Sequence, residues 1–268
     1  MDVTAGVVHA QGLDIAYRRA GSGPPLVLVH GAADDGRAWQ PQLAALGDEF
    51  TVVAWDEPGA GQSSDLPAGF GLADYVECLA ALIEAIGLGP VHVAGLSWGG
   101  TLVLELYRRR PDLVVTLILV DTYAGWKGSL PETEVRDRVA GISRMLAASP
   151  AAFDPTLPGL FAGDPPVEFL PLLEQIAASV RPASLRTQLN LMAEIDQRDL
   201  LRRIAVPTLL IWGELDVRSP LRVAHEFEEA IPGATLVVLP GAGHVSNLER
   251  PELFNAAVRE FSRLHSPP

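Results

Sequence analysis

Residues 95–100 read GLSWGG and directly follow the apolar run VHVA at 91–94. A serine with glycines two positions before and after it, where a strand meets a helix, is typical of a nucleophile elbow. Such a turn strains the backbone of the serine, and side chains at Gly95 and Gly99 would collide with it. The pattern therefore predicts that Ser97 projects its hydroxyl from the end of a strand. An ordinary glycine-rich turn is the plainer alternative; a phosphate loop lacks support, because there is no Walker lysine and no Gly-x-Gly-x-x-Gly spacing.

A serine hydroxyl is a poor nucleophile at neutral pH and needs a base. Among the six histidines, His244 has the best position, in the glycine-rich loop GAGH that follows the last predicted strand. His92 lies inside the strand that leads to Ser97, where we expect a core residue. The remaining histidines other than His30 are expected on the surface: His9, His225 and His265.

A histidine base needs a carboxylate that fixes its tautomer. Two aspartates stand at predicted strand ends, Asp121 after TLILV and Asp216 after TLLIWGEL. We favour Asp216, because the order Ser, Asp, His along the chain is usual for this elbow. Asp121 is the alternative acid, and it could instead cap the segment that follows it.

Short apolar and β-branched runs alternate with helical patterns along most of the chain, which is typical of an α/β protein with a mostly parallel sheet. From residue 122 to residue 204 no strand pattern appears, and proline-separated helical patterns replace the alternation. We therefore expect a core domain of residues 1–121 and 205–268 and a helical cap of residues 122–204. The predicted strands are 6–10, 14–20, 25–30, 50–55, 91–95, 114–121, 207–213 and 234–240, the first two forming an antiparallel hairpin.

Composition excludes several classes of function. The formal net charge of -13 argues against binding to nucleic acid or to an anionic membrane surface. The single cysteine, Cys78, excludes an internal disulfide and a cysteine-based zinc site. No signal peptide pattern and no membrane-spanning apolar run is visible, so we expect a cytoplasmic protein. We also expect no metal and no cofactor.

Five motifs in order resemble the α/β-hydrolase superfamily over nearly the whole chain. They are LVLVHGAADDGRAW, VVAWDEPGAGQSSD, GLSWGG, GELDVRSP and GAGHVSNLERPELF. The resemblance implies an eight-stranded, mostly parallel sheet with a helical cap inserted after the sixth strand. It also implies an oxyanion hole built from the backbone amides of Ala32 and Trp98, with His30 as a structural residue that orders the loop.

The resemblance and the residues together predict an esterase or lactonase with Ser97, His244 and Asp216 as its triad. We expect a small, largely apolar carboxylic ester or lactone as substrate, with an acyl-homoserine lactone as one candidate, and water as the second reactant. Carbon–carbon bond hydrolysis or perhydrolysis on the same triad stays open, as does a ligand receptor with this fold. The oligomeric state stays open as well. Candidates for the pocket wall are Trp98, Trp126, Phe153, Phe161, Phe169, Leu189 and Met192.

Overall fold

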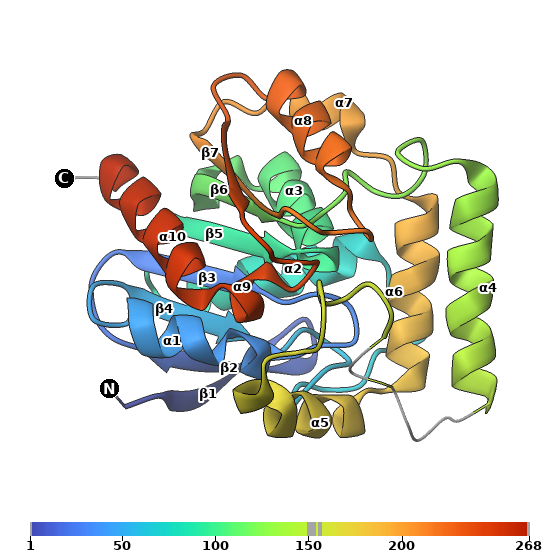
Figure 1. Cartoon of the computed structure of the whole chain (residues 1–268). Helices are drawn as coiled ribbons and strands as arrows, with labels where there is room; N and C mark the ends of the chain where they lie inside the picture. The colour runs from blue at the N-terminus through green and yellow to red at the C-terminus, as the bar shows by residue number, and fades with distance from the viewer. Residues whose placement is uncertain (1, 149–153, 155–156, 267–268) are drawn as a thin grey trace.

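The centre of the protein is one sheet of eight strands in the order β1-β2-β4-β3-β5-β6-β7-β8, seen in a computed structural model that describes residues 2–148, 154 and 157–266 (Figure 1). β1 and β2 form an antiparallel hairpin, β2 pairs antiparallel with β4, and the other neighbours are parallel. This is the α/β arrangement that the sequence predicts. The strands are β1 (Thr4–Ala10), β2 (Leu13–Ala20), β3 (Pro25–Val29), β4 (Thr51–Trp55), β5 (Val91–Leu96), β6 (Val114–Val120), β7 (Thr208–Gly213) and β8 (Thr235–Leu239).

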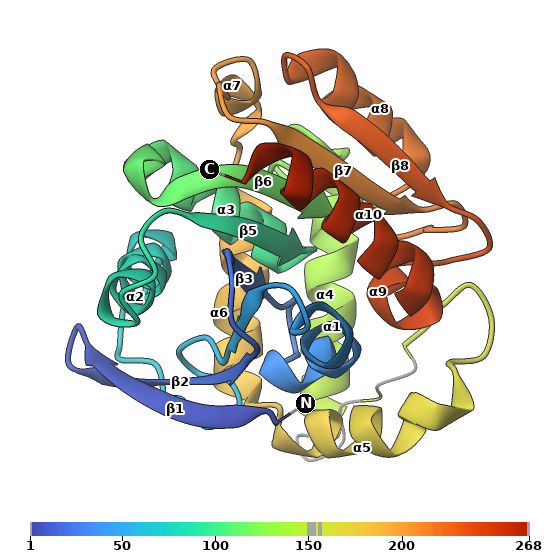
Figure 2. The same ribbon diagram turned by 90° about the vertical axis from the view of Figure 1, so that its left-hand side faces the viewer.

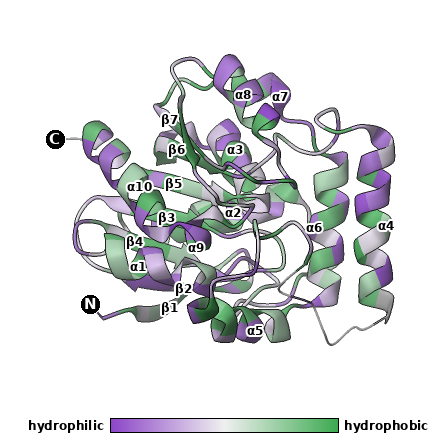
Figure 3. Ribbon diagram, in the orientation of Figure 1, coloured by the Kyte–Doolittle hydropathy of each residue, from purple (hydrophilic) through white to green (hydrophobic). Residues whose placement is uncertain are grey.

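The inner strands are mostly apolar because helices cover both faces of the sheet (Figure 2). In β3, Val27 and Val29 belong to the core cluster on one face, whereas Leu26 and Leu28 belong to the cluster on the other face. Figure 3 shows the central strands mainly in the hydrophobic colour, while the outer helices mix both colours. The period of two residues in a strand thus fills two cores at once.

Helices on the two faces pack against these clusters. One face carries α1 (Gln40–Leu46) and α10 (Pro251–His265), and the other carries α2 (Leu72–Ala85), α3 (Trp98–Arg109) and α8 (Leu221–Ala230). Short turns complete the core: η1 (Gly36–Trp39), η2 (Pro111–Leu113) and α9 (Ser246–Glu249).

Between β6 and β7 the chain leaves the sheet and forms a helical segment, residues 122–204. It contains α4 (Glu132–Ala148), η3 (Val167–Phe169), α5 (Leu170–Ser179), α6 (Pro182–Glu194) and α7 (Arg198–Leu201). α4 and α6 pack side by side beyond the carboxyl ends of the parallel strands (Figure 1). Ligands of open α/β sheets bind at that edge. Among the described helices, none combines the length and the apolar character that crossing a membrane requires.

Candidate active site

Ser97 occupies a strained turn between β5 and α3. Its backbone angles are φ 52° and ψ -114°, in a region that non-glycine residues rarely adopt. A Cβ at Gly95 would lie 2.4 Å from the carbonyl oxygen of Gly99, and one at Gly99 would lie 2.3 Å from that of Val29. Because backbone atoms cannot yield at such distances, both positions require glycine. The glycines let α3 approach the sheet closely enough to hold Ser97 in its strained conformation.

His244 and Asp216 complete a hydrogen-bonded chain from Ser97. His244 Nε2 lies 3.0 Å from Ser97 Oγ, and His244 Nδ1 lies 2.8 Å from Asp216 Oδ2. The second oxygen of Asp216 accepts hydrogen bonds from the backbone amides of Arg218 at 2.8 Å and Ser219 at 2.9 Å. Asp216 is therefore oriented by its own loop, and the histidine is oriented by Asp216. The structure brings together the three residues that the sequence predicts as a triad.

Asp121, the alternative acid, lies in the same region but bonds elsewhere. Its Oδ1 accepts a hydrogen bond from the amide of Gly213 at 2.7 Å, and its Oδ2 accepts one from the hydroxyl of Ser246 at 2.5 Å. Burial, together with the negative charge of nearby Asp216, raises the pKa of Asp121 well above its ordinary value. Asp121 thus ties the loops after β6, β7 and β8 together, and it has no hydrogen bond to His244 among those of the described residues.

The two amides expected to form the oxyanion hole belong to residues near Ser97. Trp98 is the first residue of α3, so its N–H has no partner within the helix. Ala32 lines the cavity beside Ser97, and a Cβ on the preceding residue, Gly31, would lie 3.6 Å from Ser97 Cβ. Within the described part of the chain, neither amide donates a hydrogen bond to a protein acceptor. Both are available to a ligand oxygen.

His30 fixes the loop that carries Ala32. Its Nε2 accepts a hydrogen bond from the amide of Glu57 at 3.1 Å, so its Nδ1 carries the hydrogen and donates to the carbonyl of Gly31 at 2.8 Å. Burial lowers the pKa of His30 and favours this neutral tautomer. His30 is placed as the sequence predicts, as a residue that orders the loop. His92 is also buried, where its Nδ1 lies 2.8 Å from Thr116 Oγ1 and burial lowers its pKa to about 4.

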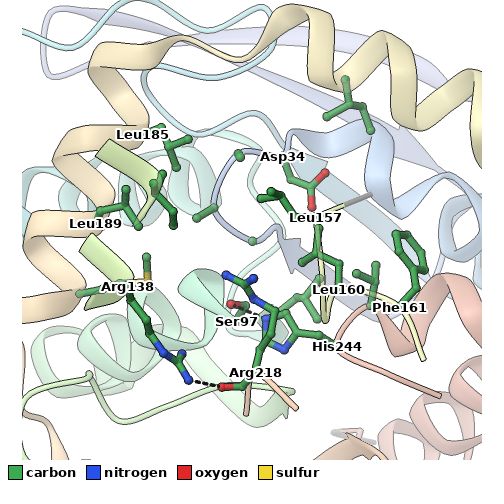
Figure 4. A pocket seen from close by; sticks show the side chains of 18 of the residues that line it. Asp34, Ser97, Arg138, Leu157, Leu160, Phe161, Leu185, Leu189, Arg218 and His244 are labelled. Atoms are coloured by element: carbon green, nitrogen blue, oxygen red, sulfur yellow. Dashed lines mark hydrogen bonds between the residues drawn. The ribbon is translucent and has the colours of Figure 1, made fainter. Parts of the chain in front are cut away.

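Ser97 and His244 open into a cavity of about 100 Å³ between the sheet and the helical segment (Figure 4). Most of its wall is apolar. Of the predicted wall residues, Trp126, Phe161, Leu189 and Met192 line the cavity. Phe169 is outside the cavity wall and packs against a small cluster of Leu173, Val245 and Leu248. Phe153 lies outside the described residues.

Trp98 contradicts the expectation that its indole shapes the pocket. The side chain is fully buried and belongs to the core, and Trp98 is not among the described residues that line the cavity. Its Nε1 donates a hydrogen bond to Glu57 Oε2 at 2.9 Å, and the other oxygen of Glu57 accepts one from Gln188 of α6. Because α3 turns the indole away from the strand end, Trp98 links the elbow to a buried carboxyl. Burial raises the pKa of Glu57 to about 8.

Comparison with known proteins identifies the family of this chain. Residues 26–257 match the sequence model of the Alpha/beta hydrolase family. The chain belongs to this family. A putative carbamate hydrolase, RutD, from Klebsiella pneumoniae subsp. pneumoniae is 30% identical over 259 residues, which cover 92% of this chain and 94% of the relative.

Two solved structures are similar to this chain in their fold as well as in sequence. A thermophilic esterase from Thermogutta terrifontis, determined with malate bound, superposes with a TM-score of 0.85 at 27% identity and covers 98% of this chain and 100% of its own. A putative non-heme bromoperoxidase, BpoC, from Mycobacterium tuberculosis gives a TM-score of 0.79 at 27% identity, with 94% and 97% covered. The chain is thus an enzyme of the hydrolase class, with relatives that differ in the reaction they are named for.

The cavity of this hydrolase is also lined by three ionisable residues that the sequence did not point to: Asp34, Arg138 and Arg218. Asp34 comes two residues after Ala32, and Arg218 comes two residues after Asp216, so motif position could have pointed to both. Arg138 lies in α4, where the sequence offers no such signal. Burial, and then the charge of Asp35, raise the pKa of Asp34 to about 8.

The arrangement suits acyl transfer. It offers a hydroxyl bonded to a base, a base bonded to an acid, and two free amides next to the hydroxyl. Among the described residues, no three histidine, cysteine, aspartate or glutamate side chains are grouped as a metal ion would require.

Proposed function

We propose that this enzyme is a serine hydrolase that cleaves small carboxylic esters or lactones through an acyl-enzyme. The hydrogen-bonded chain from Ser97 through His244 to Asp216, built on a strained elbow that opens into a small cavity, carries the proposal. The esterase relative, at 27% identity over nearly the whole chain, supports it.

The geometry assigns a role to each group. Ser97 Oγ attacks the ester carbonyl while His244 Nε2 takes its proton, and Asp216 stabilises the imidazolium that forms. The carbonyl oxygen becomes an oxyanion that the amides of Ala32 and Trp98 stabilise, each contributing about 3 to 4 kcal/mol to lowering the barrier. His244 then gives its proton to the leaving alkoxide. Water, activated by His244, releases the acid and restores the Ser97 hydroxyl.

We further propose that the helical segment of residues 122–204 is a cap over this site. Trp126, Leu189 and Met192 belong to it, and they line the same cavity as Ser97. A roof of this kind excludes bulk water and strengthens the electrostatic interactions inside. It also limits the substrate to molecules of modest size. The cytoplasmic location stays a prediction.

The experiment compares wild type with Ser97→Ala on p-nitrophenyl acetate and butyrate. We expect kcat to fall by about 10⁴-fold or more, because the nucleophile is lost. A fluorophosphonate probe should label wild type once, on Ser97, and should not label the variant. Ser64→Ala is the matched control, because its hydroxyl accepts a hydrogen bond from the amide of Asp14, away from the site. Full turnover by Ser97→Ala would refute the proposal.

Perhydrolysis on the same triad is a second candidate, favoured by the putative bromoperoxidase relative at 28% identity over 93% of this chain. Hydrogen peroxide in place of water would attack the acyl-enzyme and release a peracid, with Ser97 restored as before. Oxidation of bromide in the presence of acetate and peroxide measures this activity. If wild type and Ser97→Ala oxidise bromide equally, the triad plays no part in it.

A further inference from the structure

One wall of the cavity carries a guanidinium that forms no ion pair with any of the described residues. Arg218 is half-buried, lines the cavity, and extends its side chain toward Ser97 in Figure 4. Among the described residues, no acidic side chain forms an ion pair with its guanidinium. The hydrogen bonds of Arg218 to other described residues run through its backbone: the amide donates to Asp216, and the carbonyl accepts from Tyr123 and Arg138. Burial, followed by the charge of Arg138, lowers its pKa below the ordinary value for arginine. A cation held in this way is costly unless an anion joins it.

The neighbouring groups hold the backbone of Arg218 in place, and none of the described acidic side chains forms an ion pair with its guanidinium. The carbonyl of Arg218 accepts hydrogen bonds from Tyr123 Oη at 2.7 Å and from Arg138 Nη2 at 3.0 Å. Arg138 in turn pairs with Glu134 and lies over the rings of Tyr123 and Trp126. The backbone at Arg218 is therefore fixed from two sides, while its guanidinium is left for a ligand.

The charge of Asp216 favours the protonated form of Arg218, but neither carboxyl group near the cavity, Asp216 or Asp34, forms an ion pair or a hydrogen bond with the guanidinium. Both oxygens of Asp216 are already engaged, with His244 and with the amides of Arg218 and Ser219. Asp34 is drawn away from Arg218 in Figure 4, and with a pKa of about 8 it is mostly protonated at neutral pH. At pH 7 the cavity thus presents a positive side and a neutral polar side, with apolar residues between them.

We propose that Arg218 binds a carboxylate of the substrate, so that the substrates are short hemi-esters of dicarboxylic acids or lactones that carry a carboxylate. The proposal rests on the serine hydrolase function proposed above. A guanidinium binds a carboxylate through two parallel N–H···O bonds, which fixes orientation as well as position. With the carboxylate at Arg218, a spacer of a few carbons places the ester carbonyl over Ser97, consistent with a cavity of about 100 Å³. A substrate of this class differs from the largely apolar ester, and from the neutral acyl-homoserine lactone, that the sequence suggests.

The test compares two esters of similar size, monomethyl glutarate with its free carboxylate and methyl pentanoate with none, followed by pH-stat at pH 7. We expect wild type to give a kcat/KM for monomethyl glutarate at least tenfold above that for methyl pentanoate. Arg218→Met should lower the first value about 10- to 100-fold, mainly through KM, since charge-assisted hydrogen bonds are lost. The ratio of the two kcat/KM values isolates the effect of the carboxylate, because methyl pentanoate has no anionic group for the guanidinium to bind. Arg218→Lys keeps the positive charge but not the planar guanidinium that makes two parallel hydrogen bonds. Its kcat/KM for monomethyl glutarate should lie between those of wild type and Arg218→Met.

Arg203→Met is the control: it removes the same charge from an exposed surface residue that pairs with Asp199. It should change kcat/KM for neither ester. Calorimetric titration of Ser97→Ala with glutarate measures binding without turnover, and the double variant with Arg218→Met should lose that binding. An unchanged ratio of the two esters in Arg218→Met would overturn the carboxylate site alone. Failure of wild type to hydrolyse either ester, or full turnover by Ser97→Ala, would overturn the hydrolase proposal instead. Carboxylate on the alcohol side is tested with acetoxyacetate against propyl acetate, and a preference confined to this pair would place the Arg218 site on the leaving-group side.

Discussion

The two buried aspartates of the site offer a matched pair of substitutions, Asp216→Asn and Asp121→Asn. An asparagine at 216 would keep one oxygen for the amides of Arg218 and Ser219, now bound to Asp216 Oδ1 at 2.8 and 2.9 Å. Its NH₂ group would then face His244 Nδ1, where a carboxylate oxygen lies at 2.8 Å in the wild type. A donor there stabilises the tautomer with hydrogen on Nε2, which cannot accept the proton of Ser97. The imidazolium also loses its counter-charge.

Serine triads that undergo this change lose about 10⁴-fold in kcat, which corresponds to about 5.4 kcal/mol in the barrier. Asp121→Asn should cost less than about tenfold. Its oxygen can still accept from Gly213, and its NH₂ group can donate to Ser246.

The assay is kcat for p-nitrophenyl acetate at pH 7.5, with thermal denaturation of both variants to show that they fold. Comparable losses in the two variants, or a larger loss from Asp121→Asn, would refute the assignment of Asp216 as the acid that orients His244.

Three further outcomes follow from the buried polar groups. Glu57→Gln should flatten the pH dependence of stability. A carboxyl whose pKa rises to about 8 on folding stabilises the protein fully below about pH 4.5 and loses that contribution as the pH rises to about 8. Urea denaturation at pH 5 and pH 8 should therefore show a greater fall in the free energy of unfolding for wild type than for the variant. Trp98→Phe should cost about 1 to 3 kcal/mol of stability, because Glu57 loses a buried hydrogen bond, yet the preference among acetate, butyrate and hexanoate esters should not move, since the indole is not in the cavity wall. Wild type should lose activity toward monomethyl glutarate above about pH 8, where Asp34 becomes anionic and repels the substrate, and Asp34→Asn should remove this loss. The ratio of kcat/KM for monomethyl glutarate to that for methyl pentanoate isolates this effect. An identical pH profile of the ratio in the variant would argue against it.

The fold was predictable because its determinants are local. Most inner strands are nearly continuous apolar runs, and each of them lies in the sheet near the predicted residues. The hairpin of β1 and β2 is also local: it turns at Gln11 and Gly12, which both have positive φ angles of 54° and 77°. A period of two or 3.6 residues and a turn signal suffice for such elements.

The meeting of Ser97, Asp216 and His244 was predictable for a related reason. Ser97, Asp216 and His244 each follow a strand of one parallel sheet, and the carboxyl ends of such strands meet at one edge. The direction of a side chain within a turn is another matter. Trp98 is next to the nucleophile in sequence, but the first turn of α3 directs its indole into the core, toward Glu57. No pattern in the sequence encodes that direction, because it depends on how the segments that pack around the start of α3 are arranged in space.

The charged residues of the cavity show where specificity is built in this enzyme. Asp34 and Arg218 sit on the two loops that also carry Ala32 and Asp216, so the contacts that hold the catalytic groups also hold the groups that face the substrate. The surface as a whole is acidic, with a formal net charge of -13, and would repel an anionic substrate at a distance. At physiological ionic strength that repulsion is screened beyond about 8 Å, whereas a guanidinium in a largely apolar cavity is screened far less. Selection of an anion is therefore decided inside the cavity, by the pairing that Arg218 offers after the substrate has entered.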